Sequence, residues 1–343
     1  MAGDGYRVGV VGATGLVGTT ILELLADRDF PAAEVVPFAS ERSAGRELQW
    51  SGSPIVCREL SDDSIQGLDL VLSSAGGAIS AEWTPRLVEA GAVVVDNTSY
   101  WRMHDDVPLV VAEVNPEALD AHKGIVANPN CSTMQMVVAL KPLFDEAGVE
   151  RLVISTYQAV SGTGKAAIDE LNEQSRAVLA GEQPLASIYP HPIAFNVLVQ
   201  AGSFPAGDDH TDEERKLINE TRKILGDEQI RVSATCVRVP VVSGHSEAVN
   251  VETKRALSPE RARELLAAAP GVTVLDDPAA GLYPMARDAV GKDDVFVGRI
   301  RRDPGNEQAL DIWVVSDNLR KGAATNTVQL AELLVERDLL NRG

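Results

Sequence analysis

Short apolar runs alternate with amphipathic patterns along the first third of the chain. The first run, Arg7 to Val11, predicts a buried strand, and a glycine-rich turn and a helix to about Ala26 follow it. A second helical pattern covers Ser80 to Ala90. The other strand candidates are Glu34–Ala39, Leu68–Leu72, Ala92–Asp96, Leu109–Val111 and Ile125–Asn128. This alternation predicts a doubly wound parallel sheet.

After residue 131 the strand-like runs become longer and fewer helices separate them. The strand candidates are Arg151–Ala159, Ile230–Val239, Ala248–Thr253, Val295–Ile300 and Ala309–Val315. Helical patterns cover Thr133–Ala147, Lys165–Ala180, Asp212–Leu225 and Pro259–Ala268. Long strands with few intervening helices predict an α+β domain with much antiparallel pairing.

Two segments complete the predicted organisation. Ala180 to Asp212 is rich in Pro, Gly and polar residues, and we expect an extended surface excursion there. Asn318 to Leu340 predicts one long final helix. We therefore expect a first domain from residues 1–130, completed by residues 318–343, and a second domain from residues 131–317.

Three glycines, Gly12, Gly15 and Gly18, follow the first strand and open the first helix. This is the context of a dinucleotide-binding turn, where glycine lets the backbone approach a pyrophosphate and the helix N-terminus receives its charge. The spacing is GxxGxxG instead of the commoner GxGxxG, so a tight turn without a nucleotide is the alternative. The cofactor contacts expected here are Gly12, Thr14, Gly15, Leu16, Val17 and Gly18.

The residues after the second strand bear on the choice of cofactor. An acidic residue there binds the ribose hydroxyls of NAD, whereas Arg and Ser accept the 2′-phosphate of NADP. Arg42 and Ser43 favour NADP, although Glu41 precedes them. We expect NADP, with use of both cofactors as the alternative.

A cysteine, Cys131, lies between a strand-like run and a helical run, within Asn128 to Thr133. At a helix N-terminus, unpaired N–H groups and the helix dipole lower a thiol pKa and can stabilise an oxyanion. The alternative is a buried structural cysteine. Pro129 and the polar neighbours of Cys131 favour the reactive interpretation.

Composition narrows the classes of partner. Fifty acidic and 31 basic residues give a net charge of −19, which disfavours nucleic acid or an anionic membrane surface. Cys57, Cys131 and Cys236 are widely spaced with no CxxC, so neither a disulfide framework nor a metal site is indicated. No signal-peptide pattern or membrane-length apolar run is present, and a reduced cytoplasmic protein is the expectation.

Taken together, several motifs resemble the aspartate-β-semialdehyde dehydrogenase family across virtually the whole chain and in the family's order. They are GATGLVG near the N-terminus, NPNCST at Asn128–Thr133, QAVSG at Gln158–Gly162, CVRVP at Cys236–Pro240, HSE at His245–Glu247 and DNLRKGAA at Asp317–Ala324. The resemblance implies a Rossmann-like domain, a catalytic domain that mediates dimerisation, and a C-terminal helix that returns to the first domain. It implies NADPH-dependent reduction of L-aspartyl-4-phosphate to the semialdehyde with release of phosphate, in lysine, methionine and threonine biosynthesis.

The same resemblance implies residue roles. Cys131 would be the nucleophile that forms an acyl-thioester, His245 the general acid/base, and Gln158 the residue that orients the substrate. For His245, we expect an imidazole that titrates near neutrality. Ser161, Gly162 and Asn318 would contact the cofactor. Only its place seven residues after Arg238 distinguishes His245 from the other four histidines.

The substrate, an amino acid with an acyl phosphate, needs more than one anion site. By resemblance, Arg238 would clamp the carboxylate, Glu213 would take the ammonium, and Arg102, Asn130 and Lys216 would contact the phosphate. An exposed i,i+3 ion pair is the alternative for Glu213 and Lys216. Arg102 could instead pack its stem beneath a loop.

Other functions remain open at this point. A thiol-dependent reductase of another acyl phosphate, or of an acyl-CoA, is the nearest alternative. A non-catalytic dinucleotide-binding paralogue belongs to another class, but it would need neither Cys131 nor His245. We expect small-molecule partners (aspartyl phosphate, aspartate semialdehyde and phosphate) and a homodimer, with a homotetramer as the alternative.

Overall fold

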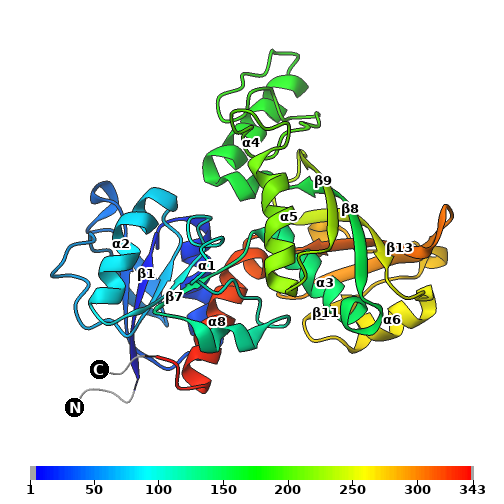
Figure 1. The fold of residues 1–343 in the computed structure, drawn as a ribbon. Helices are drawn as coiled ribbons and strands as arrows, with labels where there is room; N and C mark the ends of the chain where they lie inside the picture. Colours follow the sequence, from blue (N-terminus) through cyan, green and yellow to red (C-terminus); the bar gives the residue numbers. More distant parts are fainter. Residues whose placement is uncertain (1–4, 341–343) are drawn as a thin grey trace. The chain divides into compact units, whose positions relative to one another are not determined.

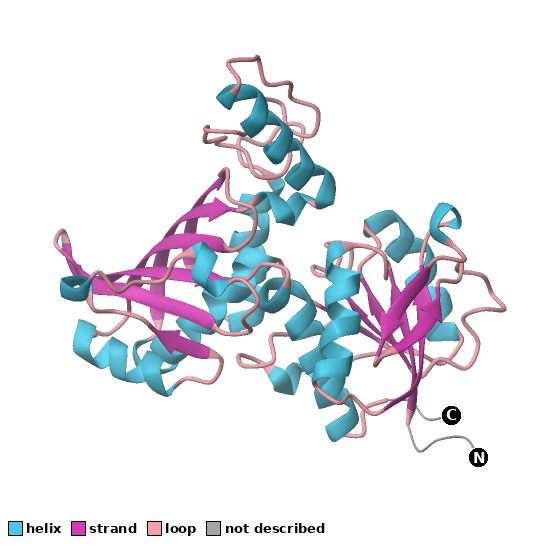
Figure 2. Cartoon of the chain, turned by 180° about the vertical axis from the view of Figure 1, so that it is seen from behind, coloured by secondary structure: helices cyan, strands magenta, loops and turns pink. Residues whose placement is uncertain are grey.

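The computed structural model describes residues 5–340, and the chain forms two compact units (Figure 1). Unit 1 contains the residues up to Asn130 and those from Ala323 onward, and unit 2 runs from Cys131 to Gly322. Each unit has its own sheet, drawn in magenta in Figure 2. No helix within residues 5–340 is long and apolar enough to cross a membrane.

Unit 1 is built on a five-stranded sheet in which every pair of neighbours is parallel, which confirms the predicted doubly wound sheet. The strand order is β2-β1-β5-β6-β7. The strands are β1 (Tyr6–Val11), β2 (Ala32–Phe38), β5 (Leu70–Ser73), β6 (Val93–Asp96) and β7 (Ile125–Ala127).

Successive residues of the central strands enter two different apolar cores, one on each face of the sheet. On β5, Leu70 and Leu72 join the core that includes residues of α1 (Leu16–Asp27) and α8 (Asn326–Glu336). Val71 between them joins the core that includes Leu87 of α2 (Gly77–Glu89). A strand buried on both faces reads as a continuous apolar run, which is why these strands are visible in the sequence.

One predicted strand of unit 1, Leu109–Val111, is wrong. Leu109 makes only an isolated bridge to Ala127. The side chain of Asn115 accepts the N–H of Val111 at 2.9 Å and donates to the carbonyl of Leu109 at 2.9 Å. These bonds occupy backbone groups that a sheet partner would need, so the chain turns instead of extending.

A small antiparallel hairpin of unit 1 has no counterpart in the predictions. It joins β3 (Glu47–Trp50) to β4 (Ser53–Val56) through Ser51 and Gly52, whose φ angles are 46° and 76°. Two positive φ angles in succession match the two-residue turns that fit the twist of a hairpin. The Ser-Gly pair was the available signal.

Unit 2 is built on a six-stranded sheet in the order β11-β12-β13-β10-β8-β9. The three central pairings are antiparallel, which confirms the predicted domain with much antiparallel pairing, and the pairings at the two edges are parallel. Its strands are β8 (Val149–Gln158), β9 (Arg231–Arg238), β10 (His245–Thr253), β11 (Val272–Val274), β12 (Val295–Asp303) and β13 (Asn306–Ser316).

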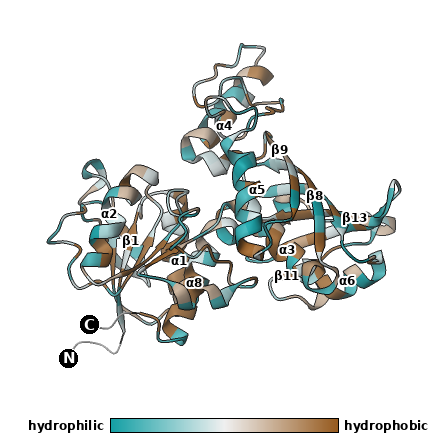
Figure 3. Ribbon diagram, in the orientation of Figure 1, coloured by the Kyte–Doolittle hydropathy of each residue, from teal (hydrophilic) through white to brown (hydrophobic). Residues whose placement is uncertain are grey.

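Three of the helices that contact this sheet are α3, with β8, β10, β12 and β13; α5, with β9; and α6, with β11 and β12. They are α3 (Cys131–Ala147), α5 (Asp212–Leu225) and α6 (Pro259–Ala268). Helix α3 is almost wholly buried from Ser132 to Leu140, whereas α5 is largely teal in Figure 3 because polar residues cover most of it. The short α7 (Ala286–Ala289) contacts β13.

The predicted surface excursion contains no helix or strand between α4 (Lys165–Leu179) and α5, as expected. Two buried side chains of α4 nevertheless form hydrogen bonds with the backbone of this excursion. Glu170 accepts the N–H groups of Ser187 and Ile188, and Gln174 accepts the N–H of Ile193 at 2.8 Å. The excursion therefore has a defined path across unit 2.

The predicted final helix, Asn318 to Leu340, is too long at both ends. A π-helical stretch spans Arg320–Thr325, and the regular helix α8 covers only Asn326–Glu336. Asn326 at its start binds the N–H of Ala112 and the carbonyl of Val110 through its side chain. Those contacts fix where α8 begins within unit 1.

Helix α5 begins with a reciprocal capping box. The Thr211 hydroxyl accepts the Glu214 N–H at 3.2 Å, and the Glu214 carboxylate accepts the Thr211 N–H at 2.9 Å. We expect Thr211→Ala to cost about 1 kcal/mol, because an N–H at the helix start loses its acceptor. The melting temperature of unit 2 should fall by about 2–4 °C in calorimetry. Thr211→Ser keeps the acceptor and should restore most of this loss; an equal loss in both variants would contradict the capping role.

Candidate active site

Register places a set of polar side chains on one face of the unit 2 sheet. Arg238 ends β9 opposite Gln158, which ends β8. Glu247 of β10 lies opposite Thr156 of β8. His245 begins β10 two residues before Glu247, so both share a face, as do Thr156 and Gln158. All five side chains are buried.

Cys131 is the first residue of α3, two residues before the predicted start of this helix. Its side chain is partly exposed, whereas Cys57 and Cys236 are buried, and none of these three described cysteines forms a disulfide. Burial raises the pKa of both Cys57 and Cys236. Cys131 therefore combines access to solvent with a helix N-terminus, the setting that activates a thiol.

The ring of His245 is completely buried, and the Ala159 N–H donates to its Nδ1 at 3.0 Å. The neutral ring therefore carries its hydrogen on Nε2. Burial, followed by the nearby charge of Arg238, lowers the pKa of His245 to about 3, against a smaller opposing effect of Glu213.

The expectation that His245 titrates near neutrality is therefore wrong for this structure. The imidazolium would lie without water and beside the positive charge of Arg238, so the neutral ring is favoured. Its Nε2 is buried and has no hydrogen-bond partner among the described residues. That unused N–H can donate to an oxygen atom of a bound substrate.

The guanidinium of Arg238 is held by a backbone carbonyl. Its Nη1 donates to the oxygen of Ala159 at 2.7 Å, and the ring of Tyr189 from the excursion lies 6.0 Å from its central carbon. Its Nε is buried without a partner, and no carboxylate within residues 5–340 forms an ion pair with it. A guanidinium fixed in this way keeps its charge for an anionic ligand.

Gln158, Glu213 and Lys216 form one connected group. The amide of Gln158 donates to one oxygen of Glu213 at 3.1 Å, and Lys216 donates to the other oxygen at 3.1 Å. Lys216 also pairs with Asp212 at 3.2 Å. The i,i+3 ion pair does form, but the Glu213 side chain is only 9% exposed, so it is not the exposed pair of the alternative interpretation.

Asn318 fastens the loops around His245. Its side-chain oxygen accepts the N–H of Gly244 at 2.9 Å, and its amide donates to the Ser161 hydroxyl at 2.9 Å. A Cβ added to Gly162 would lie 3.2 Å from Nε2 of His245 and 3.3 Å from Nη1 of Arg238. The absence of a side chain at Gly162 leaves room beside both groups.

Three residues that the sequence analysis gave no role also contribute to this region. A Cβ on Gly322 would lie 2.7 Å from the Cβ of Cys131, so only glycine fits there. The ring of Tyr189 lies near the guanidinium of Arg238. Glu247 is buried, two residues after His245 on β10. Gly322 and Glu247 stand inside the DNLRKGAA and HSE motifs, which were the available signals, whereas nothing in the sequence marks Tyr189.

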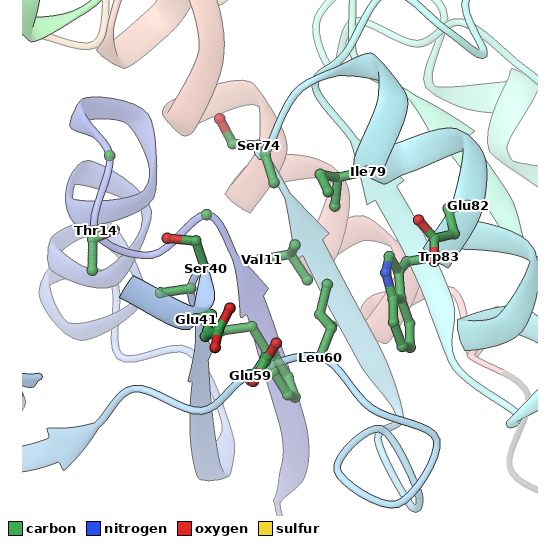
Figure 4. Close-up of a pocket in the computed structure, with 15 residues that line it drawn as sticks. Val11, Thr14, Ser40, Glu41, Glu59, Leu60, Ser74, Ile79, Glu82 and Trp83 are labelled. Carbon is green, nitrogen blue, oxygen red and sulfur yellow. The ribbon is translucent and has the colours of Figure 1, made fainter. Parts of the chain in front are cut away.

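Unit 1 has a cavity of about 610 Å³ at the carboxyl ends of β1, β2 and β5. The strand order changes direction between β1 and β5, and open α/β sheets bind ligands at this switch point. Figure 4 shows Glu41 and Glu59 on one side of the cavity and Ile79, Glu82 and Trp83 of α2 on the other.

The glycine turn that borders this cavity fits a dinucleotide. Gly12 has a φ of 81°, and a Cβ on Gly18 would lie 2.2 Å from the carbonyl oxygen of Gly12. Helix α1 starts after Gly15 with no side-chain cap, which leaves N–H groups for a pyrophosphate. Gly12, Thr14 and Gly15 line the cavity, and Leu16, Val17 and Gly18 form the first turn of α1.

The two residues predicted to select NADP come directly after Glu41, which lines the cavity. Arg42 and Ser43 belong to a short 3-10 turn, Glu41–Ser43, that begins at the cavity. Arg42 is exposed and Ser43 is half-buried. Glu41, Glu59 and Glu82 line the cavity itself. The local charge therefore includes both signs.

Arg102 is a second arginine held by backbone carbonyls, this time in unit 1. Its Nε donates to Asn128 at 3.0 Å and its Nη2 to Asn97 at 2.7 Å. Both Arg102 and Asn130 are buried. The guanidinium is thus fixed by hydrogen bonds, beyond any packing of its stem. Within residues 5–340, no group of three or more His, Cys, Asp or Glu could hold a metal ion.

Comparison with known proteins identifies the family. Residues 7–122 match the family model described as semialdehyde dehydrogenase, NAD binding domain, and residues 140–321 match the one described as semialdehyde dehydrogenase, dimerisation domain. The aspartate-semialdehyde dehydrogenase of Aquifex aeolicus is 55% identical over 98% of this chain and 100% of its own length. The chain belongs to the aspartate-semialdehyde dehydrogenase family.

Solved members of the family share the fold. Aspartate semialdehyde dehydrogenase II from Vibrio cholerae, crystallised in complex with ASA, has a TM-score of 0.94 and 46% identity over 97% of this chain and 99% of that one. The enzyme from Candida albicans, solved with NADP, has a TM-score of 0.74 and 28% identity over 98% of this chain and 100% of that one.

The buried His245 should make stability depend on pH in a specific direction. Its folded pKa of about 3 lies below the usual 6.5, so the unfolded chain binds the extra proton. Stability from this group is therefore present above pH 6.5 and is lost as pH falls toward 3. We expect the gap in unfolding free energy between the wild type and His245→Asn to shrink from pH 6.5 to 5, by up to about 1.4 kcal/mol per pH unit. Denaturant titrations at several pH values measure this gap, and a constant gap would contradict a neutral His245.

Proposed function

We propose that this chain reduces L-aspartyl-4-phosphate to L-aspartate 4-semialdehyde with NADPH and releases phosphate, on the route to lysine, methionine and threonine. The observation that carries the proposal is the group on one sheet face of unit 2. It contains His245, a neutral imidazole with an unused N–H, and Arg238, a guanidinium without a carboxylate partner among the described residues. Family membership supports the same reaction.

Cys131 is the proposed nucleophile. Its thiolate attacks the acyl carbon of the substrate, the bond from carbon to the phosphate oxygen breaks, and inorganic phosphate leaves with the electron pair. The product on the enzyme is an acyl-thioester. Bound NADPH supplies the hydride for the reduction. The N–H groups at the start of α3 favour the thiolate before the attack.

Arg238 is the proposed site for the substrate carboxylate. Its guanidinium is fixed by Ala159 and carries no competing ion pair within the described residues. Glu213 is the proposed partner of the substrate ammonium, since its buried carboxylate already accepts from Gln158 and Lys216. Gln158 then orients the substrate through the same hydrogen-bonded group.

Arg102, Asn130 and Lys216 are the proposed phosphate contacts. The backbone carbonyls of Asn128 and Asn97 orient the guanidinium of Arg102, and a guanidinium suits an anion such as phosphate. The ammonium of Lys216 forms ion pairs with the carboxylates of Asp212 and Glu213. A bound phosphate would therefore compete with these two carboxylates for Lys216. The pairing would change when substrate binds.

His245 is proposed to donate its Nε2 hydrogen to the oxygen of the reacting carbonyl. This role fits the Nδ1 bond to Ala159, which leaves Nε2–H as the available donor. A donor aimed at an oxygen that gains negative charge lowers the barrier. The acid/base role implied by the motif is proton transfer to the same oxygen. It requires the ring to bind a second proton first, because a neutral imidazole that loses its Nε2 hydrogen becomes an imidazolate.

The proposed cofactor is NADP, held by the glycine turn of unit 1 with further contacts from Ser161, Gly162 and Asn318. Arg42 and Ser43 support NADP, whereas Glu41 is the residue that would favour NAD. The match to a dimerisation domain supports a homodimer, with a homotetramer as the alternative, and we propose a cytoplasmic location. Reductases of other acyl phosphates or of acyl-CoA share the thiol chemistry, so substrate identity needs a direct assay.

The test is the reverse reaction. We expect L-aspartate semialdehyde and phosphate together to drive reduction of NADP⁺, with little rate when phosphate is omitted or when another aldehyde replaces the substrate. Cys131→Ser should abolish turnover while NADP binding and the fold remain, because a serine hydroxyl is hardly ionised near pH 7. Activity is followed by absorbance of NADPH and binding by calorimetry.

The other two cysteines provide the matched controls. Cys57→Ser and Cys236→Ser should retain most activity, since both thiols are buried with raised pKa values. An acyl adduct trapped by acid quench should map to Cys131 by peptide mass spectrometry. An adduct elsewhere, or full activity in Cys131→Ser, would rule out the covalent mechanism.

Cofactor selection is tested separately at Arg42. We expect Arg42→Ala to raise the KM for NADP more than the KM for NAD, because only NADP carries the 2′-phosphate. Glu41→Gln is the matched variant, and loss of its negative charge should lower the KM for NADP. Equal effects of Arg42→Ala on the two cofactors, or faster turnover of the wild type with NAD, would count against the assignment.

A further inference from the structure

Glu247 has a completely buried carboxyl group, and no step of the proposed mechanism uses it. It follows His245 by two residues on β10, so both side chains lie on one face of the sheet. Its exposed fraction is 0%, and neither carboxyl oxygen has a hydrogen-bond partner within the described residues. An unpaired ionised carboxylate is strongly unfavourable in such a place.

The polar groups that act on Glu247 come from the first turns of α3. The side chains of Gln135 and Ser132 are close enough to favour its charged form, although no bond of normal geometry forms. The amide nitrogen of Gln135 is itself buried without a partner. Its oxygen accepts the Ser316 hydroxyl at 2.7 Å, which ties α3 to β13.

The charges around Glu247 favour its neutral form. Glu213 of α5 is a like charge, Cys236 of β9 and His245 of β10 are neutral, and no cation pairs with Glu247 among residues 5–340. Burial raises the pKa of Glu247 well above its ordinary value, and Glu213 adds to the effect. A carboxylic acid kept neutral can donate a hydrogen bond.

We propose that Glu247 is a positioning residue. As a neutral acid it links Ser132 and Gln135, and with them the first turn of α3 that carries Cys131, to the strand that carries His245. Ser132 follows Cys131 directly, and Gln135 lies one helical turn later on the same side. The link therefore holds the thiol and the imidazole in register.

The role in turnover rests on the proposed reductase function. Two variants distinguish a role of Glu247 as a neutral hydrogen-bonding group from a role of its negative charge. Glu247→Gln keeps a neutral group of the same shape, and we expect its kcat to stay within about twofold of the wild type. Glu247→Leu removes the polar link and should lower kcat by roughly 10–100-fold with little change in KM, because a small misplacement of reacting groups is costly. Glu252→Gln is the matched control, since it removes a carboxylate of the same strand that lies outside the site.

Two further measurements need no substrate. The infrared spectrum of the wild type minus that of Glu247→Gln should contain the carbonyl band of a protonated carboxyl group at pH 7. The rate at which iodoacetamide alkylates Cys131, followed against pH by mass spectrometry, should be unchanged in Glu247→Gln. In Glu247→Leu the profile should move to higher pH, because a displaced thiolate loses the N–H groups of the helix start.

The outcomes are distinct. If the infrared band is absent, or Glu247→Gln is as damaging as Glu247→Leu, Glu247 is ionised and the proposal is wrong. Wild-type kcat and alkylation in Glu247→Leu would show that it positions nothing. If Glu247→Leu does not fold, the infrared band and the Glu247→Gln profile still decide. An inactive wild type would reject the reductase function, while the substrate-free measurements would still judge Glu247.

Discussion

The backbone of one buried residue, Ala159, holds the side chains of both His245 and Arg238 in unit 2. Its N–H donates to the imidazole of His245, and its carbonyl accepts from the guanidinium of Arg238. The next two N–H groups, of Val160 and Ser161, bond to the carbonyls of Val241 and Val242, which fixes the Ala159 peptide in turn. Because a peptide group has no rotamers, it fixes the ring and the guanidinium more firmly than a flexible side chain would. The tautomer of His245 and the free charge of Arg238 both follow from this arrangement.

This arrangement also explains how a strongly acidic protein can present a site for anions. The chain carries a net charge of −19, so an exposed arginine would meet many competing carboxylates. Arg238 is instead buried and held by the neutral carbonyl of Ala159, which orients the guanidinium without cancelling its charge. In a site with little water, such a charge acts more strongly on a bound anion than it would at the surface. The acidic surface and the basic site are therefore compatible.

The sequence predicted the elements whose pattern is local and failed where tertiary contacts decide. The strands of unit 1 are continuous apolar runs, and α5 shows its own capping signal, Thr211 with Glu214, so each could be predicted from neighbouring residues. Leu109–Val111 has the same apolar pattern, but the side chain of Asn115, four residues after Val111, takes its backbone groups. In the site, the motifs predict Cys131 and His245. The neutral state of His245 depends on Ala159 and Arg238, which meet it only through the fold.

The spacing of Arg238 and His245 in the sequence has a geometric origin in the sheet of unit 2. Strand β9 is parallel to β8, and β10 is antiparallel to β8, so the chain leaves β9 and enters β10 at the same end, on either side of β8. Residues 239–244 must therefore pass over the end of β8, and Gly244 accomplishes the final turn with a φ of 90° while its N–H bonds to Asn318. A change of one residue in this crossing would either shift the pairing of β10 by one position or strain the loop. A shift would turn both His245 and Glu247 to the opposite face of the sheet, because side chains alternate along a strand. The six residues between Arg238 and His245 are therefore a requirement of strand register. This register is the reason why the spacing of the two residues predicts the site, although the spacing itself has no chemical role.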